Sequence, residues 1–342
     1  MAGVTNYQKP ASVQNTGDEL ANFLKVFSGD VLKAFTRAGK VMGNHMTKSI
    51  DNGKATTFPV MGRGKAHYLP AGSNLDDLRE AIPHNEITIN IDGLLTADVL
   101  ITDIYEAMLH YEVRSEYAKQ LGEALAIASD GAVVAEIAKL VKANKENITG
   151  LGKGIVVEKT ITGGAGINYE TGKAVIDGLL EMKSKWTSQY VPEEERFAYI
   201  TPEVESALIA SKDAINKDYG AVATIVDGNI DKLCGFKIVA VPHLKAGGAD
   251  KTGMLGTAPE GHEFPADYAN ALAVCAHRTA VATVKLKDLQ LEHARRAELQ
   301  ADMIIAKNAV GHGGLRPEAS GIILAKSVSY THLRAHETDS YL

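Results

Sequence analysis

Residues 55–92 read ATTFPVMGRGKAHYLPAGSNLDDLREAIPHNEITINID, and this stretch decides the architecture. Apolar and polar residues alternate in ATTFPV (55–60) and again in EITINID (86–92), which predicts two half-buried β-strands. The 24 residues from Gly62 to Asn85 are rich in Gly, Pro and charge. Connections this long are uncommon in compact domains unless they are functional.

The two strands predict a long arm that needs a surface to lie on. A two-stranded ribbon is marginal in water, and residues 55–92 carry few apolar side chains from which to build a core of their own. Two alternatives follow from the residues: a lid over an active site on the same domain, or an arm laid across another subunit.

Two helical patterns flank this arm. Large apolar residues recur at three- and four-residue spacing in 16–39, which predicts an amphipathic helix. A second pattern begins with Asp103 and Glu106 at capping-box spacing. Its longer part, 114–141, predicts a helix of 28 residues, about 42 Å long at 1.5 Å per residue. The many Ala and Gly residues of this helix would let other backbone come close.

Glycines between 150 and 166 mark a change of composition, and we place a domain boundary there. Residues 168–264 show strand and helix patterns of a separate α/β unit, whereas 271–326 returns to long strands. We therefore expect a body that is interrupted by an inserted domain and then completed.

The sequence GHGGLRPEA (311–319) predicts a tight turn followed by a bend. Three glycines there indicate backbone angles or close contacts that a Cβ would obstruct, and a proline fixes the exit direction. The residues of this structural turn are Gly311, Gly313, Gly314, Arg316 and Pro317.

Composition limits the class of protein. The chain has 342 residues, of which 45% are hydrophobic and 23% charged, as in ordinary globular proteins. No apolar run approaches the ~18 residues that span a bilayer, and the first twenty residues lack a signal-peptide pattern. We therefore expect the protein to stay in the cytosol where it is made. Cys234 and Cys275 predict buried apolar residues rather than a disulfide.

The net charge of −6 is unevenly distributed, since residues 1–54 hold seven Lys or Arg against four Asp or Glu. Such asymmetry can mark a basic segment that meets an acidic partner. The cations are too few and too widely spaced for a nucleic-acid patch, so a solvated face is the preferred interpretation.

The motifs that enzymes need are missing from the sequence. There is no phosphate-binding GxxxxGK[ST], no GxSxG and no HExxH. His262 with Glu263 is interpreted as part of an exposed loop, and His277, His293 and His312 as structural histidines. We predict no catalytic residue, metal site or cofactor. We expect instead a role that depends on the geometry of the protein.

Several long blocks resemble a known family. They are IDGLLTADVLITDI (91–104), HYEVRSEYAKQLGEALAIASDGAVVAEIA (110–138) and VKLKDLQLEHARRAELQADMIIAKNAVGHGGLRPEASG (284–321). They are similar to the major capsid protein of short-tailed phages of the T-seven group, and the resemblance runs from about Gly17 to Lys326.

This resemblance implies an α+β, Hong Kong 97-like phage capsid fold. The implied parts are an N-terminal arm (1–54), an extended two-stranded loop (55–92), a peripheral domain with a long spine helix (93–145), an inserted axial domain (146–264), return strands of the peripheral domain (265–326) and a tail unlike the family (327–342).

The resemblance also implies a function, that of a non-enzymatic shell protein. Pentamers and hexamers would form an icosahedral capsid that encloses double-stranded DNA without sequence-specific binding. A separate scaffolding protein and a portal protein would be partners, and the chain would occupy the virion, or the host cytoplasm during assembly. The alternatives are an encapsulin-like cargo nanocompartment of the same fold and, less favoured, an enzyme with a lid.

The family resemblance favours the intersubunit interpretation of the arm over the lid. We then expect the charged residues of the tip to contact a neighbouring subunit, giving register and partner choice more than affinity. These residues are Arg63, Lys65, Asp76, Asp77, Arg79 and Glu80.

Overall fold

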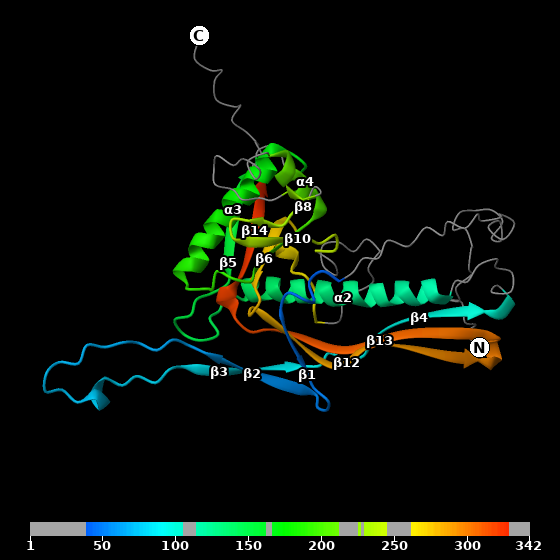
Figure 1. The fold of residues 1–342 in the computed structure, drawn as a ribbon, viewed down its shortest axis with the longest axis horizontal. Coiled ribbons are helices and arrows are strands. Elements are labelled where there is room, and N and C mark those ends of the chain that lie inside the picture. Colours follow the sequence, from blue (N-terminus) through cyan, green and yellow to red (C-terminus); the bar gives the residue numbers. More distant parts are fainter. Residues whose placement is uncertain are drawn as a thin grey trace, which may run out of the picture.

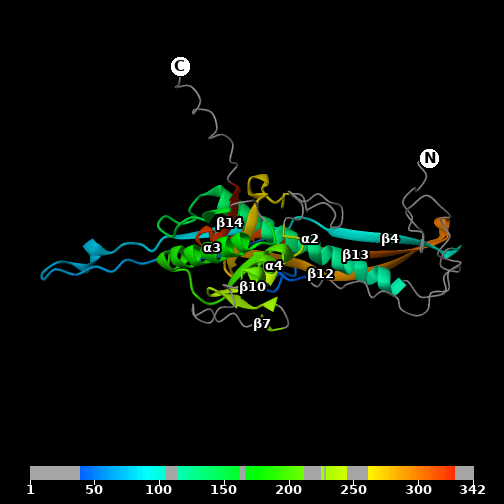
Figure 2. The same ribbon diagram turned by 90° about the horizontal axis from the view of Figure 1, so that it is seen from above.

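The computed structural model describes residues 39–104, 114–161, 166–211, 225–226, 229–244 and 261–327. These residues form a long sheet, a second sheet above one end of it, a helix along the long sheet, and an arm that extends the other way (Figure 1). Seen from above, the arm and the long sheet lie along one axis (Figure 2). The helix expected over 16–39, apart from its last residue, and the tail from 328 onward lie outside the described residues.

The long sheet has four strands in the order β1-β12-β13-β4. Their bounds are Met46–Ser49 (β1), Val281–Arg296 (β12), Ala301–Gly314 (β13) and Leu95–Thr102 (β4). β12 and β13 form an antiparallel pair along almost their whole length, whereas β1 lies parallel to β12. The long strand predicted over ADMIIAKNAV (301–310) is confirmed, and β13 runs four residues beyond it. The long strand predicted over AVCAHRTAVATVKLK (273–287) is wrong, because the chain turns at 278–280 and divides into two strands of different sheets.

The second sheet has six strands in the order β5-β14-β11-β6-β10-β9. Their bounds are Ile155–Ile161 (β5), Ser320–Ser327 (β14), Ala271–His277 (β11), Arg196–Ile200 (β6), Phe236–Ala240 (β10) and Lys232–Leu233 (β9). Helices α3 (Tyr169–Ser188) and α4 (Pro202–Ala210) lie beside it (Figure 1). A small hairpin is formed by β7 (Ile225–Val226) and β8 (Asn229–Ile230).

The strands of 265–326 are divided between the two sheets. β12 and β13 belong to the long sheet, but β11 and β14 belong to the six-stranded sheet. Every residue of β11 is buried. A strand with no exposed face must be paired on both sides and covered on both faces, and the six-stranded sheet meets this need by placing β11 between β14 and β6. The alternation of apolar and polar side chains along one strand does not predict which strands pair with it.

Helix α2 spans Arg114–Ala143, two residues beyond the prediction, and is about 45 Å long at 1.5 Å per residue. Another segment comes close to its backbone at Gly154, a glycine outside the helix. A Cβ added at Gly154 would lie 2.7 Å from the Cα of Val141, which is too close for any side chain. In the described part of the chain, no helix is long and apolar enough to cross a membrane.

The largest apolar core lies between the six-stranded sheet, α3 and the second half of α2. Trp186 is fully buried there, with its ring 5.2 Å from that of Phe236. The strand and helix patterns of 168–240 are confirmed in α3, β6, α4 and β10. Cys275 is buried as predicted, whereas Cys234 is only half-buried.

A buried carboxylate in α2 holds the start of the described chain. Asp130 is fully buried and accepts backbone N–H bonds from Lys40 at 2.6 Å, Val41 at 3.1 Å and Met42 at 3.0 Å. Its Oδ2 atom also lies 3.4 Å from Nε2 of the buried His243. These bonds compensate the cost of burying the charge, and they anchor the segment that leads into β1.

Candidate assembly site: the arm and its root

Two antiparallel strands build the arm, as the sequence predicted. They are β2 (Ala55–Met61) and β3 (His84–Asn90), paired from Ala55 with Asn90 to Met61 with His84. The alternation puts Phe58, Val60 and Ile89 on the buried side. In Figure 1 the arm crosses below the long sheet and continues past the body.

The half of the arm next to the body packs on other segments of its own chain. The expectation that no local core holds the arm was therefore wrong for this half. Phe58 and Ile89 pack with Ala282, Val284 and Leu315 of the body. Further along, Val60 packs with Ile148 and Leu151. The alternation showed that one side of the arm is apolar, but the surface that covers this side comes from segments distant in sequence.

The glycines of GHGG lie in strand β13 and not in a turn, which corrects the prediction. Their φ angles lie outside the left-handed region, so close contact rather than backbone angle requires glycine here. An added Cβ would lie 2.0 Å from the carbonyl oxygen of Asn90 at Gly311, 2.8 Å from Ile89 at Gly313 and 2.3 Å from Leu140 at Gly314. The expectation of obstructed contacts is thus confirmed. Alternate residues of β13 contact the arm and helix α2.

The bend itself comes just after the glycines. The N–H groups of Leu315 and Arg316 both donate to the carbonyl of Ala280, at 2.8 and 3.2 Å. A short 3-10 turn, Pro317–Ala319, follows. Arg316 pairs with the buried Glu318 at 2.7 Å. Arg316 and Pro317 therefore redirect the chain from the long sheet into β14.

The charged residues of the arm tip are largely paired within the chain. Lys65 lies 2.8 Å from Glu80, and Arg79 lies 2.8 Å from Asp76, and all four side chains are at least half exposed. Asp77 belongs to the 3-10 turn Leu75–Leu78, between these pairs. The tip charges thus form two local pairs, and their contact with a neighbouring subunit stays a prediction.

Arg63 does not join these local pairs of the tip. Its guanidinium lies 4.6 Å from the ring centre of Tyr190 and donates a hydrogen bond to the carbonyl of Gln189. It therefore ties the arm to the segment after α3.

The arm tip also exposes large apolar side chains, which the sequence analysis did not select. Tyr68 is fully exposed, and Leu69, Leu75 and Ile82 are at least half exposed. They follow no helical or strand period, so a periodicity search passes over them. The available signal was five large apolar residues, these four and Leu78, in a segment otherwise rich in Gly, Pro and charge.

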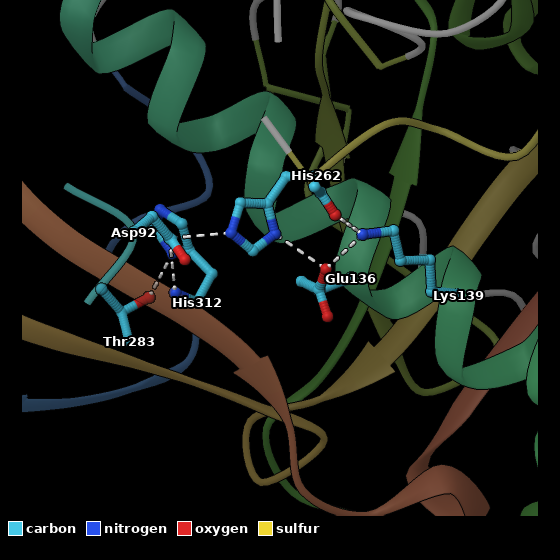
Figure 3. Close-up of polar contacts among 7 residues, drawn as sticks. Asp92, Glu136, Lys139, His262, Thr283 and His312 are labelled. Carbon is cyan, nitrogen blue, oxygen red and sulfur yellow. Dashed lines mark hydrogen bonds and ion pairs between the residues drawn. The ribbon is translucent and has the colours of Figure 1, made fainter. Parts of the chain in front are cut away.

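A buried ion cluster lies where the arm joins the body (Figure 3). His262 is 5% exposed, which corrects its interpretation as part of an exposed loop. Its Nε2 atom lies 2.7 Å from Oδ2 of Asp92, and its Nδ1 atom lies 2.7 Å from Oε1 of Glu136. Lys139 pairs with Glu136 at 2.8 Å and donates to the carbonyl of Gly261. The partners are 126 and 170 residues away from His262, beyond the reach of local pattern reading.

The geometry requires a charged ring at His262. A neutral imidazole has one donor and one acceptor nitrogen, whereas both nitrogens here face carboxylate oxygens. Burial alone would lower the pKa of His262, but the hydrogen bonds to Asp92 and Glu136 raise this pKa to about 9. Burial raises the pKa of Glu136, yet the bonds from His262 and Lys139 lower it overall.

The neighbouring histidine, His312, is neutral. Burial and the adjacent charge of His262 lower the pKa of His312 to about 3. The two rings meet edge to face, 5.4 Å apart. Among the described residues no group of three or more side chains could hold a metal ion. The arrangement is an ion cluster that joins elements, in which Asp92, Glu136, Lys139 and His262 pair with one another, whereas Nε2 of the buried His312 has no hydrogen-bond partner among the described residues.

The long helix, the long sheet, the arm and the second sheet define the class as a Hong Kong 97-like phage capsid protein. A solved capsid structure of the cyanophage P-SCSP1u matches with a TM-score of 0.73 and 31% identity, over 94% of this chain and 99% of that one.

Sequence comparison identifies the family more closely. The major capsid protein of Enterobacteria phage T3 is 50% identical over 92% of this chain and 95% of its own length. That of Escherichia phage T7 is 48% identical over 95% and 99%. The family model described as "Gp10A-like: Major capsid protein" matches residues 57–324. The chain belongs to this family of major capsid proteins, which decides against the cargo nanocompartment.

Proposed function

We propose that the chain self-assembles into an icosahedral shell around a double-stranded DNA genome, and that the arm tip is a contact between subunits. The observation that carries the second part is the exposed surface of the tip. Tyr68, Leu69, Leu75 and Ile82 are exposed in the single chain, in a segment otherwise rich in Gly, Pro and charge. Exposed apolar groups that gather in one segment mark interaction sites.

The ion pairs of the tip suit a supporting role in this contact. The pairs Lys65–Glu80 and Asp76–Arg79 are already formed within one chain. Exposed pairs of this kind contribute little to stability, and at an interface they favour register over affinity. Tyr is enriched among residues that dominate interface energy. We therefore assign the affinity to the apolar side chains and the register to the charges.

The finer parts of the proposal rest on family membership. The subunits form pentamers and hexamers, with a separate scaffolding protein and a portal protein as partners, and assembly takes place in the host cytoplasm. The shell encloses DNA without reading its sequence, in keeping with a chain of net charge −6, and it does so without an enzymatic step.

Assembly of a tip variant tests the intersubunit role. We expect Tyr68→Ser combined with Leu69→Ser to leave the chain folded by circular dichroism, because both side chains are exposed. With scaffolding protein present, the variant should lose most fast-sedimenting particles. The matched control is Leu180→Ser on α3, an apolar residue that is 51% exposed away from the arm. Shells at wild-type yield from the tip variant would refute the proposal.

A further inference from the structure

Two short links connect the arm to the body. One, residues 50–54, joins β1 to β2, and the other, residues 91–94, joins β3 to β4. Each contains a glycine with positive φ, Gly53 at 120° and Gly93 at 131°, a conformation that other residues rarely adopt. The links are bonded to each other through the N–H of Ile91 and the carbonyl of Lys54, 2.9 Å apart. The arm is therefore attached at one narrow root. The contacts at this root act on its direction together with the packing of Phe58, Val60 and Ile89 on the body.

Asp92 makes these contacts for the second link. Its N–H donates to the carbonyl of Val310 at 3.2 Å. Its carboxylate oxygen Oδ2 accepts from the N–H of His312 at 3.3 Å and from Nε2 of His262 at 2.7 Å. Because the other nitrogen of His262 bonds to Glu136, the ring lies between the arm root and helix α2 (Figure 3).

We propose that His262 is a positioning residue: its imidazolium ties Asp92 of the arm root to Glu136 of helix α2 and so, together with the apolar packing of the arm on the body, holds the direction in which the arm leaves the body. This inference rests on the proposed function, since the direction of the arm matters only when its tip contacts another subunit.

The groups that face His262 support a charged joint at neutral pH. Asp92 comes from the arm root, and Glu136 and Lys139 come from α2. The cluster then holds two anions, Asp92 and Glu136, and two cations, Lys139 and the imidazolium of His262. Its net charge is close to zero, which lowers the cost of burying these charges.

On the sheet side stands the neutral His312 of β13, which bonds through Nδ1 to Thr283 at 2.9 Å. Thr283 bonds in turn to His45, 2.6 Å away, and burial lowers the pKa of His45. The sheet side therefore adds no positive charge at neutral pH.

The joint has a defined pH range. The pKa of His262 is raised from 6.5 to about 9 in the folded chain. The stabilisation from the charged ring is complete below pH 6.5 and is lost as the pH rises toward 9. On the acid side the lowered pKa of Glu136 keeps this carboxylate charged to below its ordinary value of 4.5. The tie persists through the neutral range and opens in alkali.

Hydrogen exchange of the full, unassembled chain tests the joint. The relevant peptides cover 89–95 and 309–314, and rates are corrected for the intrinsic effect of pH. In the wild-type chain these peptides should exchange at least ~10-fold faster at pH 9.5 than at pH 7. His262→Gln, which can serve one carboxylate at a time, should show the fast rate already at pH 7. The matched control is His84→Gln, at an exposed position, which should behave as wild type, and peptide 271–277 should stay protected in all variants.

Wild-type exchange at 89–95 in His262→Gln, or a ring that titrates near 6.5 by NMR, would overturn the inference. If His262→Gln does not fold, Asp92→Asn must show the same local acceleration, and the NMR titration of the wild-type chain decides independently. The two proposals fail separately. Normal shells from the Tyr68→Ser, Leu69→Ser variant would refute the tip contact and leave the exchange result standing, whereas unchanged link exchange would refute the joint whatever the shells do.

Discussion

The tip and the root of the arm use the same chemistry in opposite surroundings. At the tip, Lys65 and Glu80 are 2.8 Å apart with side chains 71% and 51% exposed. At the root, His262 and Glu136 are 2.7 Å apart with side chains 7% and 14% exposed. Water and salt screen the first pair. The second pair lies out of water, where an ion without a partner is costly.

The distance between two charges therefore does not determine how much the pair contributes to stability, whereas the burial of the two side chains does. The tip pairs join residues 3 and 15 positions apart along one segment. The root cluster joins the arm, helix α2 and the segment that precedes β11. A local, hydrated pair can be rearranged at low cost when a neighbour arrives. A buried cluster that joins three elements resists rearrangement and keeps their relative directions.

The contrast predicts unequal effects for the same substitution at the two ends. Glu136→Gln should destabilise the chain by about 3 kcal/mol, because it leaves the buried charges of His262 and Lys139 short of a partner. Glu80→Gln, the matched change at the tip, should leave the unfolding midpoint unchanged. Urea denaturation of both variants measures the difference. Equal midpoints would show that the root pair is as well hydrated as the tip pair.

A glycine comparison gives the next largest effect. Gly311→Ala should cost about 2 kcal/mol, because the added Cβ would meet backbone at the carbonyl oxygen of Asn90 and push the arm off β13. Gly64→Ala at the tip should be tolerated, since its Cβ would make an ordinary contact at 3.5 Å with Ile82. The readouts are thermal unfolding and exchange at 89–95. A Gly311→Ala chain with wild-type stability would mean that the arm lifts from the sheet without cost.

The smallest change in stability is expected from charge reversal at the tip. Asp76→Lys combined with Asp77→Lys breaks the exposed pair between Asp76 and Arg79, so circular dichroism and the melting temperature should stay close to wild type. Assembly with scaffolding protein should fall, because many copies of a contact with wrong register add up in a shell. Intact shells at full yield would show that the charges have no part in register, and loss of folding would return the arm to an intradomain role.

Sequence reasoning located the elements of this fold well but did not assign the strands to sheets. The arm strands and helix α2 agree with their patterns within two residues, because alternation and helical spacing are local properties. The assignment of β11 and β14 to the second sheet was missed, because a fully buried strand shows no period that names its partner. The domain boundaries expected in the chain stay a prediction.

The candidate site divides in the same way. The sequence selected the tip charges and the glycines, but it took GHGG for a turn and His262 for an exposed residue. In both cases the deciding neighbour was distant: Asn90 for Gly311, and Asp92 with Glu136 for His262.

The order of residues was enough to establish an arm, a long helix, a class of protein without enzyme motifs, and a resemblance to a capsid family, because these depend on short-range patterns and on long similar blocks. The tertiary structure alone decided on which surface the arm rests, at which glycines an added Cβ would meet neighbouring atoms, and which charges are buried. These properties arise from contacts between segments that are far apart in the sequence. Burial, which sets the energy of a charge or of an added Cβ, exists only once the chain has folded.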